Sequence, residues 1–142
     1  MWQQLREDRS VVETVIEETL RYESPVQRLL RHTTREVEVS GVRIPEGAIV
    51  NVFYGPANRD PAAFPHPDEF RLDRDLRNHV AFGAGIHYCL GAPLAQAEAS
   101  ITLNTFLDRF PQLIRGSTPA VRQTTGFVVY GFQRLPLVLA AT

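Results

Sequence analysis

The strongest constraint in this sequence is a glycine-rich segment, residues 82–91, that carries the only cysteine of the chain directly before a predicted helix. Gly83 and Gly85 allow positive φ angles and close backbone approach, so the backbone can fold tightly around whatever Cys89 faces. The apolar spacing that follows predicts a helix over residues 94–109. Cys89 therefore lies just before a helix N-terminus, which makes it a candidate metal ligand.

The helix dipole favours a thiolate at this position, and a bound metal would deprotonate the sulfur. His87 lies two residues before Cys89 and could donate to an anionic group beside the sulfur. Two alternatives remain. A lone cysteine is most often a small buried hydrophobe, although such a residue needs no glycines on both sides. A zinc site would combine Cys89 with His87, His79 or His66, but the chain has no Cys-x-x-Cys pair and no paired-histidine helix spacing.

The same segment matches the haem-binding loop of a known family. That loop has the pattern F-G-x-G-x-[H/R]-x-C-x-G, and its fixed positions are occupied here by Phe82, Gly83, Gly85, His87, Cys89 and Gly91. The chain therefore resembles the cytochrome P450 superfamily, the haem-thiolate monooxygenases, in their soluble bacterial form. The resemblance implies haem b as the cofactor, with Cys89 as the proximal thiolate on the iron, Phe82 shielding the sulfur and His87 binding a haem propionate.

A second helix is predicted upstream, where Ser10 and Glu13 have the spacing of a capping box. An apolar stripe continues the helix, and a proline ends it near residues 22–24. Within this helix Glu18 and Arg21 stand three residues apart, so they lie on one face and can pair. Such pairs are usually solvated surface contacts that contribute about 0 to 1 kcal/mol.

Glu18 and Arg21 also match the E-x-x-R motif that precedes the haem loop in cytochromes P450. In that family the pair is buried and forms a network with an arginine from the irregular loop before the haem-binding turn. The corresponding loop is predicted over residues 58–74, where prolines disfavour helix and strand. Arg74 occupies the usual position of that arginine, and Arg59 is the second candidate. The resemblance implies a structural role for these residues and not a catalytic one.

Short β elements are predicted between and after the two motifs. Alternating residues at 36–39 and 42–44, followed by a mostly apolar run at 48–54, indicate a small antiparallel sheet. Near the C-terminus, residues 127–130 and 135–139 indicate a hairpin.

The resemblance implies further site residues. Arg31 matches by position the arginine that holds the second haem propionate, and the alternative is an ordinary surface arginine. Segments 25–29 and 125–129 correspond to substrate-facing segments of the family, and the alternative for the second is a simple core hairpin. The candidate substrate-facing residues are Val26, Leu29, Phe127 and Val128.

The resemblance covers all of residues 1–142, but only the C-terminal third of a cytochrome P450. We therefore expect a mainly α fold with small antiparallel β elements, forming a single partial domain that carries the haem-binding part. The family's oxygen-activating motif, A-G-x-[D/E]-T, does not occur in the sequence. Two function classes stay open: a truncated or split monooxygenase that oxidises an organic substrate with O2, or a non-enzymatic haem-binding or interaction remnant.

Net charge, apolar runs and the cysteine count limit the kinds of partner and location that we expect for this chain. The formal net charge of -1 suggests no nucleic acid or other polyanion. The N-terminus lacks the apolar core of a signal peptide, and no apolar run approaches the ~18 residues that a membrane span needs. A single cysteine excludes an internal disulfide. We expect a cytoplasmic protein, with a ferredoxin or similar electron donor, a small organic substrate and a distal-half polypeptide as candidate partners.

Overall fold

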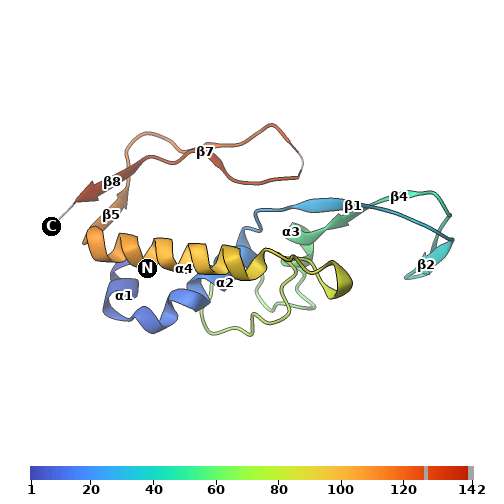
Figure 1. Ribbon diagram of the computed structural model, residues 1–142, viewed down its shortest axis with the longest axis horizontal. Coiled ribbons are helices and arrows are strands. Elements are labelled where there is room, and N and C mark those ends of the chain that lie inside the picture. The colour runs from blue at the N-terminus through green and yellow to red at the C-terminus, as the bar shows by residue number, and fades with distance from the viewer. Residues whose placement is uncertain (127, 141–142) are drawn as a thin grey trace.

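The computed structural model describes residues 1–126 and 128–140 and shows an elongated molecule (Figure 1). The helices, including two short 3-10 turns, are α1 (Trp2–Glu7), η1 (Arg9–Val11), α2 (Val12–Tyr22), α3 (Tyr54–Ala57), η2 (Gly85–His87) and α4 (Ala92–Arg109). The strands are β1 (Arg28–His32), β2 (Val37–Val39), β3 (Val42–Ile44), β4 (Ile49–Phe53), β5 (Gln112–Arg115), β6 (Val121–Arg122), β7 (Phe132–Arg134) and β8 (Leu137–Ala140).

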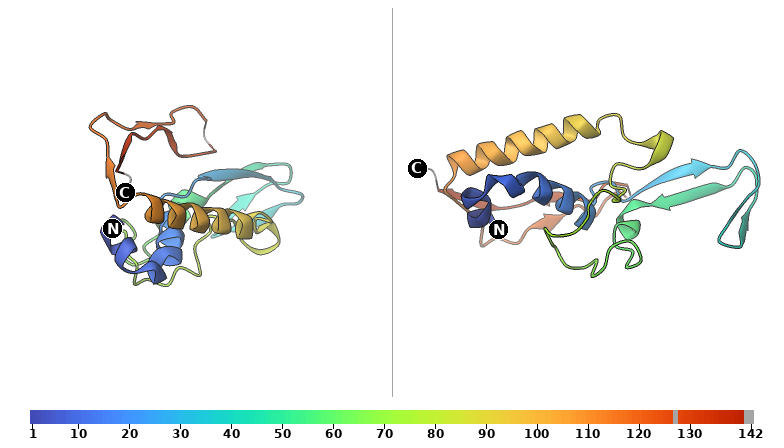
Figure 2. Two further views of the ribbon diagram at one scale, coloured as in Figure 1. Left: turned by 60° about the vertical axis from the view of Figure 1, so that its left-hand side comes forward. Right: turned by 90° about the horizontal axis from the view of Figure 1, so that it is seen from below.

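The elements are arranged around the long helix α4. Helices α1 and α2 lie along one side of α4, and a ribbon of β1 and β4 extends away from its N-terminal end (Figure 2). Strands β5 and β8 lie near the other end of α4, and the segment that carries β6 and β7 runs back over α4 toward the start of β1 (Figure 1). The irregular segment between α3 and η2 connects the β ribbon to the cysteine loop.

All sheets in the described part of the chain are two-stranded and antiparallel. The predicted elements at 36–39 and 42–44 form the β2–β3 hairpin, with Val37 opposite Ile44. The apolar run at 48–54 forms β4, but it pairs with β1 and not with that hairpin, so the expected single small sheet is two separate sheets. The mainly helical fold class with small antiparallel β elements is confirmed.

The predicted C-terminal hairpin is wrong. Strand β8 pairs with β5, and β7 pairs with β6, so both strands use partners from residues 112–122. Pro136 stands between β7 and β8 and has no N–H to donate to a ladder, whereas its carbonyl accepts from Gly116 N at 2.9 Å. The chain therefore changes partners at the proline instead of folding back on itself.

The start of α2 also differs from the expected capping box. The carboxylate of Asp8, two residues earlier than Ser10, accepts hydrogen bonds from Ser10 N at 2.9 Å and from Ser10 Oγ at 2.6 Å. The serine hydroxyl is thus occupied, and the 3-10 turn η1 leads into α2. Glu13 instead accepts from Ser100 Oγ on α4. The predicted end of the helix near residues 22–24 is confirmed, since α2 ends at Tyr22.

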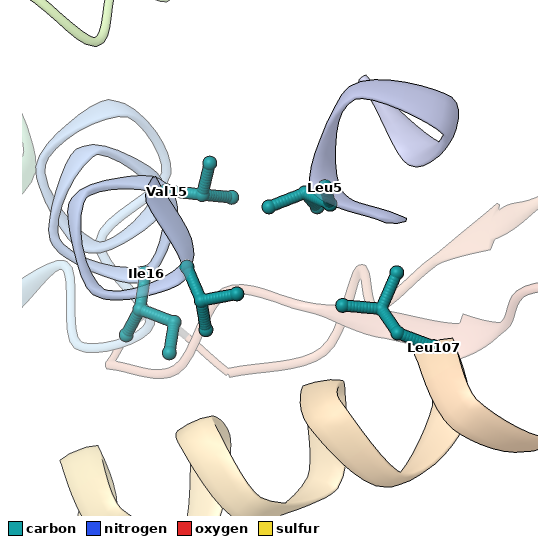
Figure 3. Packing of buried hydrophobic residues seen from close by; sticks show 5 residues of the cluster. Leu5, Val15, Ile16 and Leu107 are labelled. Carbon is teal, nitrogen blue, oxygen red and sulfur yellow. The ribbon is translucent and has the colours of Figure 1, made fainter. Parts of the chain in front are cut away.

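The hydrophobic core lies where α1, α2 and α4 meet (Figure 3). Leu5 of α1 and Leu107 of α4 face the apolar stripe of α2 across this junction. The buried members of the cluster are Leu5, Val12, Val15, Ile16 and Leu107. Leu103 of α4 packs partly buried against this cluster, whereas Leu94, Ile101 and Phe106 are exposed, so α4 contributes only part of its apolar surface to the core.

We expect Leu107→Ala to lower the free energy of unfolding by about 2 to 5 kcal/mol, because this side chain is 1% exposed and its removal leaves a cavity. Ile101→Ala is the matched control on the same helix, since Ile101 is 67% exposed, and should change stability by less than about 0.5 kcal/mol. Urea unfolding followed by circular dichroism measures both. Similar losses in the two variants would contradict this position of the core.

Candidate functional site

The cysteine loop folds back on itself through its glycines. Gly83 and Gly85 have φ angles of 76° and 59°, in the left-handed region that favours glycine. Cys89 N donates to Phe82 O at 2.9 Å, which closes the loop. A Cβ on Gly83 would stand 3.0 Å from His87 O, so a side chain there would crowd the loop backbone. The glycine spacing noted in the sequence therefore serves both the turn and a close approach.

Cys89 is exposed and lines a largely apolar cleft of about 330 Å³. The cleft lies between the end of α2, the start of β1 and the cysteine loop. A Cβ on Gly91 would lie 3.8 Å from the sulfur, which is an ordinary van der Waals contact. The residues lining the cleft are Leu20, Pro25, Val26, Leu29, Tyr54, Ala81, Phe82, Gly83, His87 and Cys89.

A second cavity of about 340 Å³ adjoins the cleft and is lined by Arg31 and His87, among other residues. His87 and Tyr54 line both cavities, and Arg31 Nη2 donates to Tyr54 Oη at 3.3 Å. Arg31 comes from β1 and His87 from η2, so residues far apart in sequence share one wall. Guanidinium and imidazole N–H groups on this wall can bind carboxylates.

The two segments expected to face a substrate lie against each other. Val26 forms an isolated antiparallel bridge with Val129, and Gln27 N donates to Val128 O at 2.7 Å. Val26 and Leu29 line the cysteine cleft, whereas Val128 shares a third cavity of about 290 Å³ with Leu29. Phe127 lies outside the described residues.

A buried ion pair stands at the end of α2. Arg21 donates to Glu18 through Nε at 2.7 Å and through Nη2 at 2.8 Å, and both side chains are 0% exposed. Arg74 adds a contact from Nε to Glu18 Oε1 at 3.2 Å and is 8% exposed. Arg59, the second candidate, pairs with Asp68 and donates to Tyr22 O. Of the two arginines, Arg74 is therefore the one that contacts the carboxylate.

The same pair holds the backbone of the irregular loop. Arg21 Nη1 donates to Asn58 O and Pro67 O, each at 2.9 Å, and Arg71 N donates to Glu18 Oε1 at 2.8 Å. Burial raises the pKa of the Glu18 carboxyl, but the hydrogen bonds from Arg21 and Arg71 N and the charges of Arg21 and Arg74 outweigh it and hold the pKa below its usual 4.5. Glu18 is thus held in its ionised form.

Sequence reasoning missed Asn58, a buried residue that connects this ion pair to the cysteine loop. Its Oδ1 accepts from Val80 N at 2.7 Å, its Nδ2 donates to Ser24 Oγ at 2.8 Å, and its backbone oxygen accepts from Arg21. Val80 comes shortly before the loop residue Phe82. The partners of Asn58 are distant in sequence, so no local pattern could have identified it.

This site suits a largely apolar ligand that carries an anionic group. It joins an accessible sulfur, an apolar cleft and a wall with two groups that can bind anions. The family model that matches the chain is described as Cytochrome P450 and aligns with residues 2–132. The chain therefore belongs to the cytochrome P450 family.

Known proteins and solved structures that are similar to this chain are also cytochromes P450. Cytochrome P450 107B1 of Saccharopolyspora erythraea is 46% identical over 135 residues, which are 94% of this chain and 33% of that protein. The 6-deoxyerythronolide B hydroxylase of the same organism is 40% identical over 136 residues, 95% of this chain and 34% of that protein. The structure of CYP109Q5 from Chondromyces apiculatus matches with a TM-score of 0.92 and 39% identity, covering 99% of this chain and 36% of that one. The chain thus spans about a third of the length of these relatives.

The family's cofactor is haem b, and the residues present fit it. The cleft offers apolar walls for the porphyrin, Cys89 offers the sulfur ligand, and Arg31 and His87 line the adjoining wall where propionates could bind. Within residues 1–126 and 128–140, no group of three or more His, Cys, Asp or Glu side chains is placed so that it could hold a metal ion. Among the helices that the structure describes, none is both long and apolar enough to cross a membrane.

We expect Glu18→Gln to lower the free energy of unfolding by about 3 to 5 kcal/mol, because it leaves the buried charge of Arg21 without its counter-ion while the side-chain shape is kept. Asp108→Asn is the control, since the Arg9–Asp108 pair is 37% and 70% exposed, and should cost no more than about 1 kcal/mol. Urea unfolding at pH 7 compares them.

The difference in stability between wild type and Glu18→Gln should also depend on pH. The folded-state pKa of Glu18 is lowered, so its stabilising contribution is complete above 4.5 and is lost as the pH falls through the folded pKa. The difference in unfolding free energy between wild type and Glu18→Gln should therefore narrow below about pH 4.5. A difference that stays constant down to pH 3 would contradict the ionised state of Glu18.

Proposed function

We propose that this chain is the haem-binding C-terminal part of a cytochrome P450 monooxygenase, with Cys89 as the axial ligand of haem b. The observation that carries the proposal is the position of Cys89, on a glycine-closed loop at an apolar cleft that adjoins a wall formed by Arg31 and His87. In this proposal Arg31 and His87 bind the propionates, and Phe82 covers the sulfur side of the loop.

The residues of the chain would each perform a defined task. When bound, thiolate-ligated haem supplies oxygen activation, because electron density from the sulfur favours O–O cleavage. Cys89 would give up its proton on binding the iron, because the thiolate is the form that binds a metal. Arg31 and His87 orient the cofactor through its carboxylates, and the apolar walls around Leu20 and Val26 exclude water from it.

The substrate class is inferred from the two segments that the resemblance makes substrate-facing. Segments 25–29 and 125–129 pair with each other, and Val26, Leu29 and Val128 present mainly apolar surface. A structure of a relative, CYP109E1 from Bacillus megaterium, is described as a complex with testosterone. We infer a small, largely apolar organic substrate for this chain, bound mainly by hydrophobic contact.

Electrons would arrive on the side of the cysteine loop. Ile86 and Leu90 belong to the same loop as Cys89 and are 98% and 99% exposed, which provides apolar contact area on this loop. A ferredoxin or similar donor docked there would shorten the electron path to the sulfur. The chain spans about a third of the relatives' length, and we infer that turnover also needs the oxygen-facing part of the fold.

Replacing Cys89 with Ala should abolish the thiolate-type spectrum, in which the Soret band of the reduced carbon monoxide complex is red-shifted, because no other thiol is present. The wild-type chain loaded with haem provides the reference. His87→Gln is a second comparison, which should weaken haem retention but keep the red-shifted band. A variant Cys89→Ala that retains the band would contradict the ligand assignment.

Turnover gives a separate expectation. The 142-residue chain, loaded with haem and supplied with a ferredoxin system, should consume reductant without forming product in proportion, because bulk water reaches the oxygen-binding face. Coupled product formation should appear when the remaining part of a related P450 is added. Efficient coupling by the chain alone would overturn the need for that part. Haem binding with no turnover in any combination would instead favour the non-enzymatic alternative.

A further inference from the structure

Glu17, the neighbour of the ion-paired Glu18, makes a cluster that none of the functions above uses. Its Oε2 contacts His79 Nε2 at 2.6 Å, and its Oε1 accepts from Gln96 Nε2 at 2.7 Å. Glu17 belongs to α2, Gln96 to α4, and His79 to the segment that enters the cysteine loop. One carboxylate therefore joins three parts of the chain.

The histidine is held at both ring nitrogens. Its Nδ1 accepts from Ala81 N at 3.2 Å, so the ring proton lies on Nε2 and is donated to Glu17. The His79 side chain is 8% exposed and that of Glu17 is 26% exposed, so water competes weakly for these contacts. The contacts thus define the tautomer and hold the ring orientation.

A short series of contacts leads from this cluster to Cys89. Ala81 is buried, lines the cysteine cleft and precedes Phe82, whose carbonyl accepts from Cys89 N. A shift of the Ala81 backbone would therefore move the acceptor that closes the loop. Consecutive residues of an α-helix point about 100° apart, so Glu18 can hold the irregular loop while Glu17 holds the cysteine loop.

We propose that Glu17 and His79 are positioning residues that set the place of the cysteine ligand through the backbone of Ala81. This inference rests on the proposed function of Cys89 as the haem ligand. The pair acts through the loop backbone and does not itself touch the cofactor. Its loss should loosen the loop and the ligand geometry, while α2 and the core remain folded.

Two substitutions test the two contacts of His79 separately, because each removes one contact and keeps the other. His79→Asn keeps an oxygen near the Nδ1 position, where it can accept from Ala81 N, but it removes the contact with Glu17. His79→Gln keeps an N–H donor near the Nε2 position for Glu17, but it removes the acceptor for Ala81 N. The control is Ser100→Ala, which removes another α2–α4 hydrogen bond, from Ser100 Oγ to Glu13 at 2.6 Å.

The first measurement uses the haem-free chain. Amide hydrogen exchange at Cys89 should be about tenfold faster in both His79 variants than in wild type, as expected for the loss of one hydrogen bond that holds the loop. Exchange in α2 should stay unchanged, which shows that each variant is folded, and Ser100→Ala should leave Cys89 exchange unchanged. Unchanged exchange at Cys89 in both His79 variants would overturn the proposal, whether or not haem binds.

The second measurement uses the haem-loaded chain. Each His79 variant should show a several-fold larger fraction without the red-shifted carbon monoxide Soret band, while Ser100→Ala resembles wild type. Faster exchange with an unchanged band would show that the pair stabilises the loop but does not position the ligand, which overturns the proposal. A wild-type chain that lacks the band would overturn the proposed function itself, and the exchange rates would then separately show whether the pair holds the loop.

Discussion

The buried ion pair of Glu18 and Arg21 is the interaction on which the rest of the structure depends. Removing two charges from water costs several kcal/mol for each ion, and this cost is offset only when every polar atom finds a partner. Here the partners are Arg74, Arg71 N and the carbonyls of Asn58 and Pro67. A proline-rich segment with little regular structure is thereby held against α2 by hydrogen bonds to charged groups, which are stronger than those between neutral groups.

Helix α2 thus organises the site from two sides. Through Arg21 and Asn58 it holds Val80, and through Glu17 and His79 it holds Ala81, so the residues that enter the cysteine loop are fixed twice. The glycines then allow the tight turn that closes between Phe82 and Cys89. The loop carries the proposed haem ligand Cys89, and buried polar contacts hold the residues at its entry.

The cleft beside Cys89 combines surfaces of different origin. Its apolar side comes from the end of α2 and the start of β1, and the adjoining wall comes from Arg31 and His87. This division suits a cofactor that is apolar over most of its area and anionic at one edge. The bridge between Val26 and Val129 brings the segment before β7 against the segment that enters β1, so the two segments proposed to face a substrate are neighbours in space.

The sequence by itself determined the features that depend on neighbouring residues. The two long helices, the β2–β3 hairpin and the glycine-framed cysteine could be predicted, because periodicity, prolines and glycines act over a few residues. The family motif further predicted the buried pairing of Glu18 and Arg21, which the structure shows, and Cys89 as the haem ligand, which stays a proposal. Only the tertiary structure decided the partners of β5 to β8 and the contacts of Asn58 and Glu17. Those contacts join residues far apart in the chain, and which of many polar side chains meet is set by packing around the core.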